Sequence, residues 1–114
     1  MEKFHGQYYG KHNIFWKGIC FKNRNVSISR LEDIIDDYGY IDDFREFSDI
    51  SISFIISIQK LKLASLLEKL KTIISIEEQI ESDAPQDDEI TVFLHVTFTE
   101  AKGKLKNEVP SVPG

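Results

Sequence analysis

The residues with the most evident chemical potential in this chain are paired carboxylates. Asp36-Asp37 and Asp42-Asp43 supply the oxygen ligands that calcium and magnesium prefer. Calcium-binding loops alternate their ligands and place a glycine at the sixth position, whereas the stretch that begins at Asp36 does neither. We therefore predict that the protein has no metal site.

The other candidate catalytic residues are three histidines and one cysteine. His5, His12 and His95 lack the close ligand pairs of zinc sites, so we expect scattered surface side chains. Cys20 with His95 as its base would form a nucleophilic pair, but its apolar, alternating surroundings favour a buried structural thiol. The sequence also has no Gly-x-Ser-x-Gly elbow and no glycine-rich phosphate loop. We predict that the protein is not an enzyme and holds no cofactor.

Nucleic acid is a possible partner that the charge balance opposes. The stretch from Lys17 to Phe21 is only weakly similar to the ribonucleoprotein-type motif of RNA-binding sheets. The formal net charge is −5, whereas nucleic-acid binding depends on Lys and Arg side chains that neutralise the phosphates. We predict no nucleic-acid partner.

The length of 114 residues is typical of a single domain. We expect residues 1–100 to form one α+β domain, and residues 101–114, which contain Gly, Lys and two Pro, to form a disordered tail. The first residues lack the apolar run of a signal peptide and no stretch is long enough to span a membrane, so we expect a cytoplasmic protein. An alternative is that the chain is one domain of a longer protein.

Hydrophobic periodicity predicts the elements that position these residues. Ser29 with Glu32 forms a capping box at the start of a helix over 29–38, and Gly39 suits a left-handed conformation just past its end. The other expected elements are an extended segment 2–9, a turn 10–13, strand 14–22, strand 50–58, helix 60–71, loop 82–88 and strand 89–99.

Two segments fit either secondary structure. Residues 40–47 alternate as in a strand, but Ile41, Phe44 and Phe47 also recur at the spacing of a short helix; we favour the strand. Residues 72–81 are β-branched enough for a strand, or they prolong the preceding helix.

The order of elements predicts an α+β fold of the ferredoxin-like, split β-α-β type, in which two helices pack on one face of a mainly antiparallel sheet of four or five strands. The uncovered face would then carry two polar rows, which are Thr91, His95 and Thr97 on one strand and Ser51, Ser53 and Ser57 on another. This plan supports many functions, so function must be argued from surface residues.

The acidic residues are concentrated in two stretches. Fifteen of the nineteen fall in residues 32–49 and 77–89, against one base, Arg45. Aromatic side chains interleave with the first stretch. Dense exposed charge steers association with an oppositely charged protein, and aromatic residues supply anchors at interfaces. We predict an acidic docking surface made of Asp36, Asp37, Tyr38, Tyr40, Asp42, Asp43, Phe44 and Glu46. A second lobe would contain Glu77, Glu78, Asp87 and Asp88 if the fold brings them near.

A compact acidic domain rich in Ile, Ser and Asp resembles bacterial immunity proteins and inhibitors of toxins or nucleases in its general character, although no motif assigns it to a family. The leading hypothesis is a binding protein that neutralises a basic protein, such as a toxin or nuclease, by covering its functional groove. The alternative is a ferredoxin-like regulatory or ligand-binding module that acts as a homodimer through its sheet, in which Thr91, Phe93, His95 and Thr97 carry the function. Monomer and homodimer both remain open.

Overall fold

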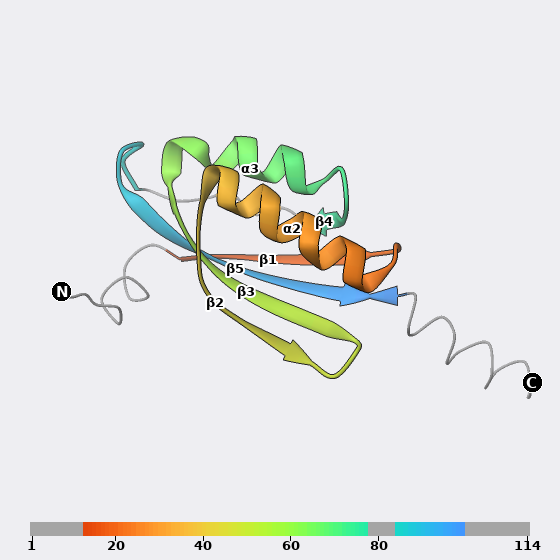
Figure 1. The fold of residues 1–114 in the computed structure, drawn as a ribbon. Helices are drawn as coiled ribbons and strands as arrows, with labels where there is room; N and C mark the ends of the chain where they lie inside the picture. The colour runs from red at the N-terminus through yellow and green to blue at the C-terminus, as the bar shows by residue number, and fades with distance from the viewer. Residues whose placement is uncertain (1–12, 78–83, 100–114) are drawn as a thin grey trace, which may run out of the picture.

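The computed structural model describes residues 13–77 and 84–99 (Figure 1). In this part of the chain the elements are β1 (Asn13–Cys20), α2 (Arg24–Tyr38), β2 (Gly39–Phe47), β3 (Ser51–Gln59), the 3-10 turn η1 (Lys60–Lys62), α3 (Leu63–Leu70), β4 (Ser75–Glu77) and β5 (Glu89–Phe98). Figure 1 shows both helices on the same face of the sheet. The predicted α+β architecture is confirmed.

The described residues form a sheet of five strands in the order β2-β3-β5-β1-β4. All neighbouring strands pair antiparallel except β1 and β5, which pair parallel. The chain first runs β1-α2-β2-β3-α3-β4, which is the split β-α-β order, and β5 is then inserted between β3 and β1. The last strand is therefore the central one, and it separates two strands that are neighbours in the simple plan.

The core lies between the sheet and the two helices. β5 alternates as predicted, with Ile90, Val92, Leu94, Val96 and Phe98 all buried. The neighbouring strand β3 adds Ile52, Phe54, Ile56 and Ile58 to the same face of the sheet. The helices contribute Leu63, Leu66, Leu67 and Leu70 from α3, and Leu31 and Ile35 from α2. Each such side chain stabilises the fold by roughly 1.5–3 kcal/mol through burial, so the periodicity of these elements determines which face each presents.

Helix α2 begins earlier than the sequence predicts. The side chain of Asn23 caps the helix by accepting a hydrogen bond of 3.0 Å from the backbone N–H of Val26. The predicted start at Ser29 is wrong, because Asn23 offers an equally good cap six residues earlier and Ser27 is buried within the helix.

The end of α2 also differs from the prediction. Gly39 has φ −161° and ψ −150°, which is extended and not left-handed, and its N–H bonds the carbonyl of Ile35. The chain passes without a loop from α2 into β2, so Gly39 serves both as helix cap and as the first residue of the strand.

Both ambiguous segments contain strands. Residues 40–47 lie in β2, as favoured, and the following turn contains Ser48 at φ 54°. Helix α3 ends at Leu70, and residues 75–77 form the short β4, which pairs with β1. The expected segments 2–9 and 101–114 lie outside the described residues, as do most of the turn 10–13 and residues 78–81. No described helix has the length and apolar character needed to cross a membrane.

Candidate docking surface

The first acidic stretch lies on the last turns of α2 and along β2, which is one of the two edge strands of the sheet formed by the described residues (Figure 1). The buried positions of α2 are Ser27, Leu31 and Ile35, and helical periodicity turns Asp36 and Asp37 away from that face. Both aspartates are exposed. Because α2 leads directly into β2, the carboxylates of Asp36 and Asp37 are followed along the chain by those of Asp42 and Asp43 on β2.

A β-bulge shapes the acidic part of β2. Ile41 pairs with Ile56 and Asp43 pairs with Ile55, so Asp42 is an extra residue in the register. The Asp42 carboxylate accepts a hydrogen bond from the Ser57 hydroxyl, whereas Asp43 accepts one of 2.9 Å from the N–H of Phe44. The bulge therefore directs two successive carboxylates toward the sheet face that the helices do not cover.

Aromatic side chains are exposed among these acids. Tyr40 is 70% exposed and Phe44 is 49% exposed. The centre of the Phe44 ring lies 6.3 Å from that of the buried Phe54 ring. Tyr38, by contrast, is partly buried against the core. Tyr40 pairs with Ser57 on the uncovered side, whereas Phe44 pairs with Phe54 on the helix side, so the two rings lie on opposite sides of β2. We call the exposed set Asp36, Asp37, Tyr40, Asp42, Asp43 and Phe44 the α2–β2 surface.

The electrostatics of α2 are unfavourable at its C-terminal end. Its last turn contains no basic residue, and Asp36 and Asp37 lie where the helix dipole is negative. Such placement typically costs about 0.3–1 kcal/mol per charge. Among the described residues neither aspartate has an ion-pair partner, whereas Glu46 pairs with Arg24 at 2.8 Å. Glu46 therefore has an intramolecular role, while no described residue neutralises the charge of Asp36 or Asp37.

The predicted second lobe is only partly near the α2–β2 surface. Asp87 and Asp88 lie in the loop before β5, at the end of the sheet where β2 begins and β3 ends. Glu77 lies on β4, the opposite edge of the sheet, with three strands between it and β2. Glu78 is outside the described residues.

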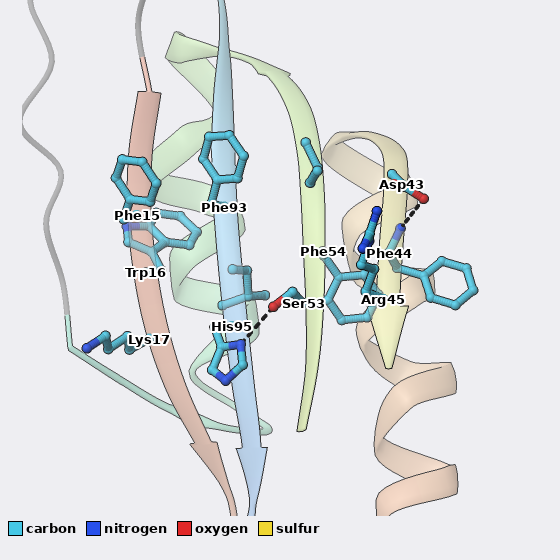
Figure 2. Close-up of a pocket in the computed structure, with 12 residues that line it drawn as sticks. Phe15, Trp16, Lys17, Asp43, Phe44, Arg45, Ser53, Phe54, Phe93 and His95 are labelled. Atoms are coloured by element: carbon cyan, nitrogen blue, oxygen red, sulfur yellow. Dashed lines mark hydrogen bonds between the residues drawn. The ribbon is translucent and has the colours of Figure 1, made fainter. Parts of the chain in front are cut away.

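The sheet face opposite the helices carries residues that the sequence analysis did not single out. We call this the open face. As predicted, it carries the Ser51, Ser53, Ser57 row and Thr91, His95 and Thr97. Phe15, Lys17 and Arg45 lie on the same face, and together with Ser53, Phe93 and His95 they line a hollow of about 230 Å³ (Figure 2). The alternation of Phe15 and Lys17 with the buried Trp16 and Gly18 is the sequence pattern that could have placed Phe15 and Lys17 on this face.

A ring stack and a hydrogen bond hold side chains that line the hollow. The rings of Phe15 and Phe93 stack with centroids 4.9 Å apart and an interplanar angle of 12°. Figure 2 shows them side by side on β1 and β5, and below them His95, whose Nδ1 lies 2.7 Å from the Ser53 hydroxyl. The hollow is thus an aromatic patch bordered by polar groups.

The arrangement does not form a cysteine–histidine pair. Cys20 is buried on the helix side of the sheet, where its Sγ lies 3.3 Å from the Ser27 hydroxyl, whereas His95 lies on the open face. The predicted buried thiol is confirmed. Within residues 13–77 and 84–99, no three His, Cys, Asp or Glu side chains cluster in a way that could hold a metal ion.

No protein-family model, curated protein or solved structure matches this chain.

Proposed function

We propose that this protein binds a basic protein partner and neutralises it by placing the α2–β2 surface over the partner's functional groove. This is the role of an immunity or inhibitor protein acting against a toxin or a nuclease. The observation that carries the proposal is the contiguous placement of exposed aspartates and aromatic rings on one helix end and one edge strand. The lone buried thiol suits a cytoplasmic site of action.

The charges would act mainly on the rate of association. Carboxylates concentrated at one edge attract a basic protein over a distance of about 10 Å at moderate salt and orient it before contact. Asp36 and Asp37 suit this role because neither is neutralised by an ion pair within the described residues. Binding through them is expected to weaken as the ionic strength rises.

The aromatic rings and the edge strand would supply the contact itself. Tyr40 and Phe44 offer large apolar area that is already exposed, which is the composition of interface anchors. In the described part of the chain β2 pairs only with β3, so its outer backbone groups are available to an extended segment of the partner.

The same acids also admit a purely protective role. Charged side chains and bulges on edge strands prevent edge-to-edge association of sheets. The two roles differ at α2, because Asp36 and Asp37 are not on the strand and yet oppose the helix dipole. A binding function accounts for unfavourable charges at that position, whereas edge protection does not.

The test is affinity capture with the tagged 114-residue chain from a lysate of its source, at low and at physiological salt. We expect wild type to retain one stoichiometric basic protein. Replacement of Asp36, Asp37, Asp42 and Asp43 by lysine should abolish this retention. A quadruple variant that folds and still retains the same protein with the same salt dependence would contradict the proposal.

A matched pair of single variants separates local charge from net charge. Asp37→Lys and Glu89→Lys change the formal charge equally, but Glu89 lies at the start of β5, outside the α2–β2 surface. Asp37→Lys should weaken binding strongly and should also raise the melting temperature, because it removes a charge that opposes the helix dipole. Glu89→Lys should alter binding little. Loss of binding in a more stable variant cannot be attributed to unfolding.

A further inference from the structure

The open face consists of side chains that align in rows across the strands. An apolar row runs from β3 to β1 and contains Ile55, Phe93 and Phe15. Next to it lies a charged row, which contains Arg45, Ser53, His95, Lys17 and Glu77 from β2 to β4. An outer row follows, with Phe47, Ser51, Thr97, Ile19 and Ser75 in the same strand order.

The apolar and outer rows expose large hydrophobic side chains. Phe15 is 59% exposed, Phe47 is 48% exposed and Ile19 is 43% exposed. Within the described residues both helices pack on the other face, so nothing there covers these groups. Large exposed apolar side chains gathered on one sheet face, on both sides of a charged row, are typical of an interaction surface.

We propose that the open face binds a second copy of this chain, related by a two-fold axis parallel to the strands and centred on β5. β5 is the third of five strands, so this rotation places β5 opposite β5, β3 opposite β1, and β2 opposite β4. Each row then faces the same row of the other copy. The arrangement is a sandwich of two sheets with aligned strands.

The charges at the two ends of the charged row are complementary under this rotation. Arg45 and Glu77 occupy opposite ends of the charged row, on the two edge strands. In the dimer Arg45 faces Glu77 of the partner subunit, and the symmetry creates the pair twice. Within the described part of a single chain, neither residue has an ion-pair partner. The second copy therefore supplies the opposite charge that each lacks.

The side-chain sizes are complementary as well. β3 carries the small Ser51 and Ser53, which face the larger Ile19 and Lys17 of the other copy's β1. Ile55 would meet Phe15 of the partner subunit. Small residues opposite large ones allow two sheets to interdigitate at the usual spacing of about 10 Å.

The size of the face predicts a weak dimer. Four long strands about 4.8 Å apart and roughly 27 Å long offer on the order of 500 Å² per copy in projection. Standard interfaces bury about 800 Å² on each partner, so we expect dissociation in the micromolar range. Asp36 and Asp37 lie on α2, across the sheet from the open face, and stay accessible in the dimer. Tyr40, Asp42 and Asp43, by contrast, lie on the open-face side of β2, so the second copy and the proposed basic partner would compete for this strand.

Sedimentation velocity of the full chain across micromolar concentrations tests the dimer. The mass should rise from 13.2 kDa toward that of two copies. Arg45→Glu or Glu77→Arg alone places two pairs of like charges in the interface, and each should weaken dimerisation about tenfold or more. The double swap, Arg45→Glu with Glu77→Arg, should restore it. Phe15→Ala should weaken dimerisation without unfolding the chain, because this ring is largely exposed.

Matched controls lie away from the open face. Arg30→Glu changes charge equally on an exposed position of α2, and Leu61→Ala truncates an exposed apolar side chain in η1. Neither should alter the dissociation constant. A mass of 13.2 kDa at every concentration would overturn the inference. So would a dimer that persists in Phe15→Ala and in both single charge reversals, or single reversals that the double swap fails to rescue.

Discussion

A Cβ atom on Gly39 would lie 2.4 Å from the carbonyl oxygen of Ser57, closer than real side chains approach a backbone atom. The contact arises because α2 enters β2 without a loop, which presses the first residue of β2 against β3. Gly39 is therefore required by close packing, since its extended φ is open to any residue.

Gly39→Ala should lower the free energy of unfolding by about 1–3 kcal/mol, because the obstacle is backbone and cannot move aside. Gly18→Ala is the control, as its nearest obstacle at 2.9 Å is the Cδ1 end of the flexible Ile74 side chain. Urea denaturation measures both variants. An equal loss of unfolding free energy in Gly39→Ala and Gly18→Ala would contradict the conclusion that the Ser57 carbonyl excludes a side chain at residue 39.

The two candidate caps of α2 can be separated by alanine substitution. Asn23→Ala removes the hydrogen bond to the N–H of Val26 and should cost about 1 kcal/mol of stability. Ser29 is an exposed residue inside the helix, so Ser29→Ala should be neutral or slightly stabilising. A larger loss in Ser29→Ala than in Asn23→Ala, measured by thermal unfolding, would place the functional cap at Ser29.

The thiol of Cys20 should react only when the fold opens. Its side chain is fully buried, with Sγ 3.3 Å from the Ser27 hydroxyl. Under native conditions we expect an aromatic disulfide reagent to modify it at a rate set by unfolding, and in concentrated guanidinium to modify it at once. Immediate reaction in native buffer would show that this edge of the core is open.

The Arg24–Glu46 pair should contribute little by itself. Nη2 and Oε2 are 2.8 Å apart, but the Glu46 side chain is half exposed. A double-mutant cycle with Glu46→Gln and Arg24→Met should give a coupling of about 0.2–1 kcal/mol that decreases with added salt. Arg24→Met alone should cost more, because the guanidinium also lies 5.7 Å from the centre of the Phe98 ring. Coupling that is insensitive to salt would contradict this account.

Local patterns were sufficient for most elements and for their buried faces. The alternation in β5 and the leucine spacing in α3 predicted which side chains form the core, because burial of one face dominates the energy of each element. The acidic stretch was likewise evident before its position was known. The start of α2 was not evident from the sequence. Asn23 and Ser29 are equivalent caps locally, and only packing against the sheet selects one of them.

Relations between distant segments were decided by the tertiary structure. β5 could pair with several strands, and only the assembled core places it between β3 and β1. That insertion adds a third strand between Glu77 and the α2–β2 surface, and His95 of β5 links the two halves of the row that runs from Arg45 to Glu77. A strand's own sequence specifies which of its faces is apolar, but strand order and register depend on long-range packing, which local periodicity does not encode.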